Sequence, residues 1–308
     1  MTKPKRSPLQ YWMRAGKGQA EPKLVIVNEA EATEPVKECF EEITASLGFA
    51  VVNVIFRAFA KYPPLLRLQW EVLKPNALTR DFFDKTEVIR RQAAAAVKDH
   101  FTVSDYRAVL RMSGLSDDAI KEIKAVLDVF LYGDPFLLLM VSCLQSALSG
   151  KPLRGKPWAH FLPQYTHPTR SFRVPLVEMT EAAPDLQTVY REIQKTTDLP
   201  FVPSDYRALG RWPRFLALAW EDWKKKIATS AYQREVRRLD ELALALAEDL
   251  PFAVVINSQA LRKAGFTPSQ IADILATVDL FQGLLPGLIT NVAAFKIGLE
   301  GGSHPPAR

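Results

Sequence analysis

Residue types that often build metal and redox sites are scarce in this sequence of 308 residues. It contains two cysteines, Cys39 and Cys143, and four histidines. Both cysteines lie inside apolar helical patterns and lack the CxxC spacing of zinc and redox sites. We expect them to be small buried hydrophobic side chains. The sequence therefore argues against a disulfide framework and against a zinc site.

Long apolar runs are also missing. The chain begins Met1-Thr2-Lys3-Pro4-Lys5 and offers no apolar stretch that could act as a signal sequence. No segment is expected to reach the ~18 apolar residues of a membrane span. We therefore predict a cytoplasmic protein without a membrane partner.

Charge of neither sign dominates, although the net charge of +6 is basic. Part of the excess lies near the amino terminus and in Lys224-Lys225-Lys226, which we interpret as solvated ends. Aromatic residues fall at core spacing rather than among the basic residues, so no nucleic-acid partner is predicted. An apolar content of 48% is typical of a folded globular protein.

What the sequence does contain is a duplication with an offset of about 150 positions. Residues 56–71 read FRAFAKYPPLLRLQWE, and residues 206–221 read YRALGRWPRFLALAWE. The same register pairs Thr79 with Thr229, and after a one-residue slip Gly114 pairs with Gly265. A unit of this length is domain-sized, unlike the shorter units of solenoids. We predict two halves related by a pseudo-twofold axis, with a cleft between them.

The predicted organisation follows from this repeat and from the proline pattern. Six prolines interrupt the connection between the halves, which also carries His160 and His167, interpreted as loop histidines without ligand spacing. The predicted segments are an amino-terminal arm with its lead-in (1–33), repeat 1 (34–150), a Pro-rich linker (151–183), repeat 2 (184–300) and a mobile tail (301–308).

Apolar residues recur at three- and four-residue intervals in both halves, and alternation typical of strands is nearly absent. The fold class is therefore predicted to be all-α. Ser116, Asp134 and Thr267 have the form of helix starts, with a capping side chain before or near a proline. The predicted helices are Pro35–Leu47, Lys85–Phe101, Ser116–Phe130, Pro135–Leu148, Pro184–Lys195, Ser230–Leu250 and Pro268–Phe281.

Two carboxylates break the symmetry of the repeat. Asp205 aligns with Ile55, and Asp134 aligns with an aliphatic residue of the second half. One interpretation is structural, with Asp205 capping a helix and Asp134 in a turn between helices. Asp105, in a second Ser-Asp-Tyr-Arg-Ala sequence, shows that this motif can be a simple helix start. If the twofold axis brings Asp134 and Asp205 to one cleft, they form a carboxylate pair.

At these residues the chain resembles the group I 2-haloacid dehalogenases, the DehI family. The resemblance covers nearly the whole length and is most specific at 57–70, at 131–135 and at 203–213. It implies an all-α fold with two pseudosymmetric halves and an active site between them. It also implies direct displacement of halide by water with inversion, without a covalent intermediate, metal or organic cofactor.

The resemblance assigns roles to residues of this chain. The catalytic Asp of the family falls on Asp205, the Ser before it on Ser204, and an Asn that helps to hold the water falls on Asp134. Pocket aromatic residues of the family are largely replaced by aliphatic ones here. The expected substrate-binding residues are Ser204, Pro203, Val51, Val54, Leu137, Phe281, Leu284 and Leu288.

Three functions remain open at this point. The first is a dehalogenase for small carboxylate substrates, with Asp205 as general base. The second is a family member that has lost this reaction and binds a small apolar ligand between the repeats. The third, a basic helical protein that binds nucleic acid, rests on charge alone. The internal pseudo-dimer predicts a monomer, with a homodimer as the alternative.

Overall fold

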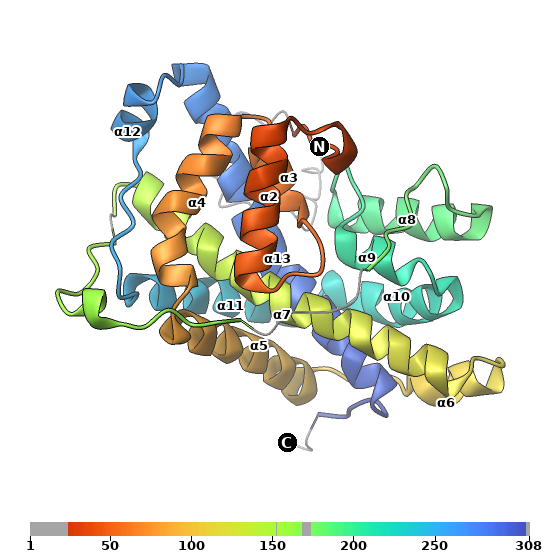
Figure 1. The fold of residues 1–308 in the computed structure, drawn as a ribbon. Helices are drawn as coiled ribbons and strands as arrows, with labels where there is room; N and C mark the ends of the chain where they lie inside the picture. The colour runs from red at the N-terminus through yellow and green to blue at the C-terminus, as the bar shows by residue number, and fades with distance from the viewer. Residues whose placement is uncertain (1–23, 152, 168–173, 306–308) are drawn as a thin grey trace, which may run out of the picture.

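The computed structural model describes residues 24–305 except residues 152 and 168–173. Within these residues the chain forms α-helices and two short 3₁₀ helices, η1 (Glu29–Glu31) and η2 (Ala159–Phe161) (Figure 1). The extended backbone pairs in the described part are two isolated bridges, Val103 with Ser303 and Leu153 with Val254. The predicted all-α fold class is confirmed.

The helices occur as two series of similar lengths. The first series is α2 (Glu34–Leu47), α3 (Val54–Phe59), α4 (Pro63–Ala77), α5 (Arg80–His100), α6 (Tyr106–Met112) and α7 (Asp117–Leu148). The second is α8 (Pro184–Thr197), α9 (Ser204–Leu209), α10 (Pro213–Ile227), α11 (Ser230–Glu248), α12 (Ser258–Lys263) and α13 (Pro268–Leu299).

One backbone contact recurs in the two series. Val27 N donates to Arg57 O, and Val177 N donates to Arg207 O, both at 3.1 Å. This is what a duplicated unit would produce, and the pseudo-twofold relation of the halves stays a prediction.

Helices α7 and α13 form the centre of the molecule, where they cross and pack against each other (Figure 1). Each has 32 residues and carries a proline in its interior, Pro135 in α7 and Pro286 in α13. The predicted breaks after Phe130 and Phe281 were therefore wrong, as was the helix start at Asp134. Burial of both helices on most sides stabilises them, which offsets the hydrogen bond that each proline removes.

Because α7 and α13 are continuous, the expectation that no segment reaches the apolar length of a membrane span was wrong. Asp117–Leu148 and Pro268–Leu299 are each long and apolar enough to cross a membrane. Their most apolar windows are 94% and 72% buried inside the folded chain. Since other helices already cover these faces, we interpret α7 and α13 as core helices.

Segments expected to be mobile are partly anchored. Val27 in the amino-terminal lead-in bonds to Arg57, and Ser303 in the tail exchanges two backbone hydrogen bonds of 2.9 Å with Val103. Residues 1–23 and 306–308 lie outside the described part. In the linker, His167 is buried and its Nε2 lies 2.8 Å from Ala77 O. The linker therefore packs onto the first half instead of only spanning a distance.

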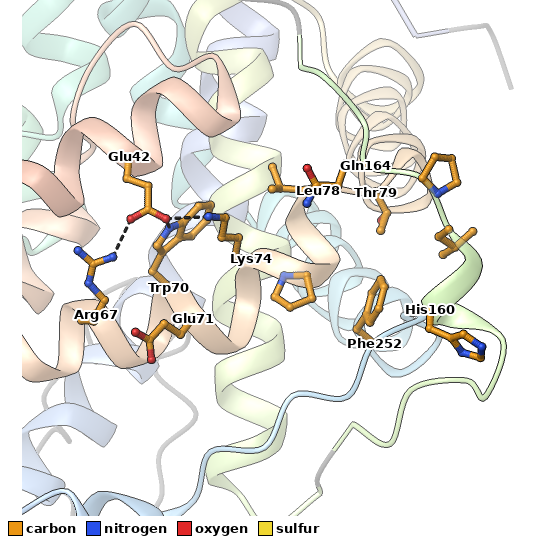
Figure 2. A pocket seen from close by; sticks show the side chains of 13 residues that line it. Glu42, Arg67, Trp70, Glu71, Lys74, Leu78, Thr79, His160, Gln164 and Phe252 are labelled. Carbon is orange, nitrogen blue, oxygen red and sulfur yellow. Dashed lines mark hydrogen bonds and ion pairs between the residues drawn. The ribbon is translucent and has the colours of Figure 1, made fainter.

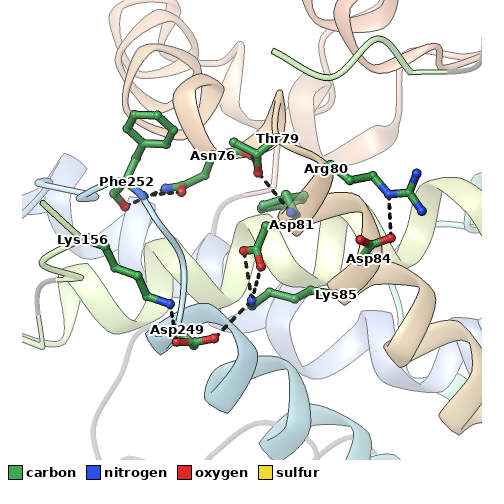
Figure 3. A network of polar contacts seen from close by, with 10 residues as sticks. Asn76, Thr79, Arg80, Asp81, Asp84, Lys85, Lys156, Asp249 and Phe252 are labelled. Carbon is green, nitrogen blue, oxygen red and sulfur yellow. Dashed lines mark hydrogen bonds and ion pairs between the residues drawn. The ribbon is translucent and has the colours of Figure 1, made fainter. Parts of the chain in front are cut away.

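A polar network ties α4 and α5 to the segment after α11 (Figure 3). Asn76 Nδ2 donates to Phe252 O, and Phe252 N donates to Asn76 Oδ1, both at 2.8 Å. Nearby, Asp249 pairs with Lys156 at 2.7 Å and with Lys85 at 3.3 Å. Asn76 is fully buried, so its two bonds are shielded from water.

This geometry predicts a large loss of stability for Asn76→Ala. The substitution leaves the Phe252 N–H and C=O without partners, which should cost about 2–3 kcal/mol in the free energy of unfolding. Urea denaturation monitored by circular dichroism measures this loss. Lys121→Ala, which removes an exposed pair with Asp118, is the control and should leave the midpoint unchanged. Equal midpoints for the two variants would contradict the prediction.

Candidate active site

Asp205 lies at the start of α9 but does not cap it. The residue before the helix is Pro203, and no side chain caps the first turn. Asp105, in the same Ser-Asp-Tyr-Arg-Ala sequence, does cap α6, since its Oδ1 accepts from Ala108 N at 3.2 Å. The helix-start interpretation is therefore right for both residues, since Asp205 stands in the first turn of α9, but only Asp105 is a side-chain cap. The Asp205 carboxylate is free for another role.

Asp134 faces Asp205 from the middle of α7, which packs against α9. The two side chains are 2% and 3% exposed, and their carboxyl groups lie close enough to form a hydrogen bond when one of them is protonated. Asp134 Oδ2 and Asp205 Oδ1 are buried and accept from no N–H or hydroxyl donor of the described residues. A proton shared between the two carboxyl groups satisfies such oxygens, and a buried carboxyl pair of this kind is typical of functional sites.

Burial raises the pKa of both carboxyl groups. The pKa of Asp134 lies well above its usual range, because the charge of Asp205 adds to the desolvation. For Asp205, burial is opposed by the hydrogen bond from Asp134, by its own backbone N–H and by the charge of Arg207. The two carboxyl groups titrate as a coupled pair that shares one proton, and the larger rise at Asp134 favours Asp134 as its carrier, with Asp205 ionised.

Arg207 supports this arrangement and was missed by the sequence analysis. Its guanidinium is 8% exposed and donates from Nη1 to Glu178 Oε1 at 2.5 Å and from Nη2 to Ser204 Oγ at 3.2 Å. Ser204 Oγ thus accepts a bond and keeps its own O–H available to donate. The arginine occurs in both repeats, at 57 and 207, so the repeat gave no reason to single out one copy.

A buried network holds the chain next to Asp205. Tyr206 Oη accepts from Asn291 Nδ2 at 2.9 Å, and Asn291 Oδ1 accepts from Tyr232 Oη and Trp223 Nε1, both at 2.6 Å. These residues come from α9, α10, α11 and α13. The network fixes α9 on the core and so fixes the position of Asp205.

The predicted lining residues lie on helices that meet around the pair. Leu137 is one turn beyond Asp134 on α7 and is buried, as are three residues of α13, which packs against both α7 and α3: Phe281, Leu284 and Leu288. Val54 begins α3 and is half-buried, as is Val51 just before it. The roles of the lining residues stay predictions.

A surface hollow of about 540 Å³ lies elsewhere, between α4 and the linker (Figure 2). One end carries Glu42, which accepts from Arg67, Trp70 and Lys74 at 2.6 to 2.8 Å. The bond from Lys74 is the largest of the effects that lower the pKa of Glu42 to about 2. Because the charge of this carboxylate is already paired, we interpret the cluster as structural. The carboxyl pair is not part of this hollow.

No group of three or more His, Cys, Asp or Glu side chains in the described residues has the arrangement of a metal site. The chemistry that the site can perform is therefore derived from its carboxyl groups. An ionised carboxylate beside a neutral one, buried from bulk solvent, can accept a proton from a bound water. The fold and this pair define the class, an all-α protein with a buried carboxyl pair between the central helix α7 and the short helix α9.

Comparison with known proteins narrows this class to one protein family. The family described as "Halocarboxylic acid dehydrogenase DehI" matches residues 50–206. An (R)-2-haloacid dehalogenase of Pseudomonas putida is 32% identical over 88% of this chain and 91% of its own length. A configuration-inverting 2-haloacid dehalogenase of Alcaligenes xylosoxydans xylosoxydans is 22% identical over 89% of this chain and 93% of its own.

Solved structures agree with these relatives. A D-2-haloacid dehalogenase mutant in complex with D-2-CPA has a TM-score of 0.85 and 31% identity, over 91% of this chain and 99% of that one. The complex of a D-2-haloacid dehalogenase with L-LA also has a TM-score of 0.85 and 31% identity, over 91% and 98%. The chain belongs to the DehI family, as the sequence analysis predicted.

Proposed function

We propose that this protein is a hydrolytic dehalogenase of 2-haloalkanoic acids. One observation carries the proposal: Asp134 from the first half of the chain and Asp205 from the second half are buried together as a carboxyl pair. The similarity to 2-haloacid dehalogenases over 88% of the chain supports the same reaction class. A small carboxylate with a halogen at the α-carbon is the corresponding substrate.

In the proposed mechanism Asp205 acts as general base. It accepts a proton from a water while the water oxygen forms a bond to the α-carbon, and the carbon–halogen bond breaks with its electron pair leaving on the halide. Attack opposite to the leaving group inverts the configuration. The product is a 2-hydroxy acid, and no bond between enzyme and substrate forms at any stage.

Asp134 supplies a hydrogen-bond donor instead of a second base. Its retained proton is directed at Asp205, which holds the ionised carboxylate in one orientation and avoids placing two negative charges beside an anionic substrate. Ser204, held by Arg207, keeps a hydroxyl proton for the substrate. The aliphatic side chains around the pair exclude bulk water, which strengthens each of these interactions.

A single-turnover experiment in H₂¹⁸O tests the proposal and its mechanism together. With excess enzyme and (R)-2-chloropropionate, we expect release of one equivalent of chloride. The label should appear in the hydroxyl group of the product, which should have the S configuration. Asp205 should gain no label, because its oxygens never enter the product.

Two results would overturn the proposal in different ways. Label in Asp205 and unlabelled product would demonstrate a covalent ester. Absence of chloride release from either enantiomer would favour the alternative of a family member that only binds a ligand, and a thermal shift with 2-chloropropionate would then support that alternative.

A further inference from the structure

Asn53 is a buried polar residue that has no structural task in the described part of the chain. It precedes α3, is 5% exposed, and its side chain does not cap the helix. No described residue forms a hydrogen bond with its carboxamide. Asn28 and Asn257 hold the same position before their helices and do accept from the first turn, from Ala30 N at 3.2 Å and Ala260 N at 2.8 Å. Asn53 is therefore not in place as a cap.

The carboxamide instead points to α7 beside the carboxyl pair. A Cβ placed on Gly133, the residue before Asp134, would lie 3.8 Å from Asn53 Nδ2. Apart from the backbone of its own helix and its chain neighbours, it would meet no other heavy atom within 4 Å. A glycine in the interior of a helix is unfavourable, and here a methyl group would fit with only an ordinary contact to Asn53, so packing alone does not require glycine at position 133. One boundary of that space is the Asn53 amide nitrogen.

The charges near this space determine which ligand group suits it. Asp134 and Asp205 together carry one negative charge, and the proposed substrate adds another on its carboxylate. Asp205 is occupied by the attacking water and by Asp134, so the substrate carboxylate needs donors from elsewhere. A carboxamide donates two N–H groups without adding a charge that would pair with Asp205. The carboxamide of Asn53, a residue that is 5% exposed and has no hydrogen-bond partner among the described side chains, meets this requirement.

We propose that Asn53 binds the substrate, with its side-chain N–H donating to the carboxylate of the 2-haloacid in the space beside Gly133. This inference rests on the proposed function for the identity of the ligand. It adds a binding residue from the first repeat, opposite the catalytic Asp205 of the second. In this arrangement Asn53 contributes to affinity and leaves the proton transfer to Asp205.

The decisive variant is Asn53→Asp, with Asn257→Asp as its matched control. Aspartate caps helices as well as asparagine does, so a purely structural role predicts no change for either variant. A donor to a carboxylate predicts a change only at position 53, because aspartate accepts instead of donating and adds negative charge. We expect KM for 2-chloropropionate to rise by about 10- to 100-fold with kcat changed far less, and KM of the control to stay constant.

Gly133→Ala tests the same space from the opposite wall. The substitution raises helix propensity and makes only an ordinary contact with Asn53, so the melting temperature should not fall. The added methyl group occupies the space proposed for the substrate, so KM should rise. A stable variant with a higher KM separates loss of binding from loss of folding. Unchanged KM in Asn53→Asp and in Gly133→Ala would overturn the inference.

Calorimetric binding of 2-chloropropionate to the Asp205→Asn protein separates this inference from the proposed function. This variant retains the space beside Gly133 and cannot turn the ligand over. Weaker binding after Asn53→Leu is added supports the inference even if the wild-type protein releases no halide. Binding that is independent of Asn53, or no binding at all, overturns it, even where the wild-type protein is an active dehalogenase.

Discussion

Asp205→Asn should lower the rate of halide release by about 10²- to 10⁴-fold while the protein remains folded, because the amide cannot accept the proton of the attacking water. The side chain keeps its shape, and the network of Tyr206, Asn291 and Tyr232 that positions α9 is untouched. Loss of activity with unchanged circular dichroism is therefore expected. Chloride release and thermal melting, measured on the same preparation, check the two parts.

The chain offers a matched control for this experiment. Asp105 occurs in an identical Ser-Asp-Tyr-Arg-Ala sequence, but it caps α6 and is not part of the carboxyl pair. Asp105→Asn replaces one good capping residue with another, so neither activity nor stability should change by much. Comparable turnover of the Asp105→Asn and Asp205→Asn proteins would contradict the assignment of Asp205 as the base.

Asp134→Asn should differ from Asp205→Asn: activity should be retained, and stability should rise at neutral and alkaline pH. Burial, reinforced by the charge of Asp205, holds the pKa of Asp134 well above its usual range. Ionisation of Asp134 at high pH removes the donor to Asp205 in the wild-type protein, which predicts an alkaline decline in activity. The amide that the substitution introduces donates at every pH, so the alkaline decline should disappear in the variant.

The stability change has a defined sign. A carboxyl group whose pKa is raised by folding keeps its proton in the native state at a pH where the unfolded chain, with a pKa of about 3.9, has released it. Stability from Asp134 is therefore complete below that value and is lost as pH rises toward the raised pKa. Since asparagine does not ionise, the gain from Asp134→Asn should approach zero near pH 4 and reach about 1–3 kcal/mol at pH 8.

Urea denaturation at pH 4, 6 and 8, together with the pH profile of chloride release, measures both effects. Wild-type protein is the reference, and the Asp105→Asn protein controls for the replacement of an aspartate by asparagine outside the carboxyl pair. A constant difference in unfolding free energy between pH 4 and pH 8 would show that Asp134 is not protonated in the folded protein. If the activity of the variant still declined at alkaline pH, ionisation of Asp134 would not be the cause of that decline.

The fold class was predictable because it depends on local pattern. Apolar residues at three- and four-residue intervals predict helices of several turns, and α2, α8 and α11 were located almost to the residue. Helices α4 and α10 were not predicted although each has 15 residues. The short helices α3 and α12 were also missed, and of α6 and α9 only the starts were expected, since six or seven residues provide too few repeats of the pattern.

The two central helices show where local rules fail. Proline in a helix interior and a Gly-Asp-Pro sequence both predict a break, and α7 continues through them. The contribution that outweighs this cost is burial of a 32-residue helix against α13, α11 and α5, none of which is adjacent to it in the sequence. A rule that considers only neighbouring residues cannot include that contribution.

The candidate site, too, was predictable from the sequence only in part. The repeat marked Asp134 and Asp205 as departures from its own pattern, and the resemblance to the DehI family assigned Ser204 beside them, all from the order of residues. Whether the two carboxyl groups meet, which of them keeps the proton, and that Arg207 and Asn53 join them depend on packing between distant helices. Desolvation and charge act through space, so only the tertiary structure decided which residues constitute the site.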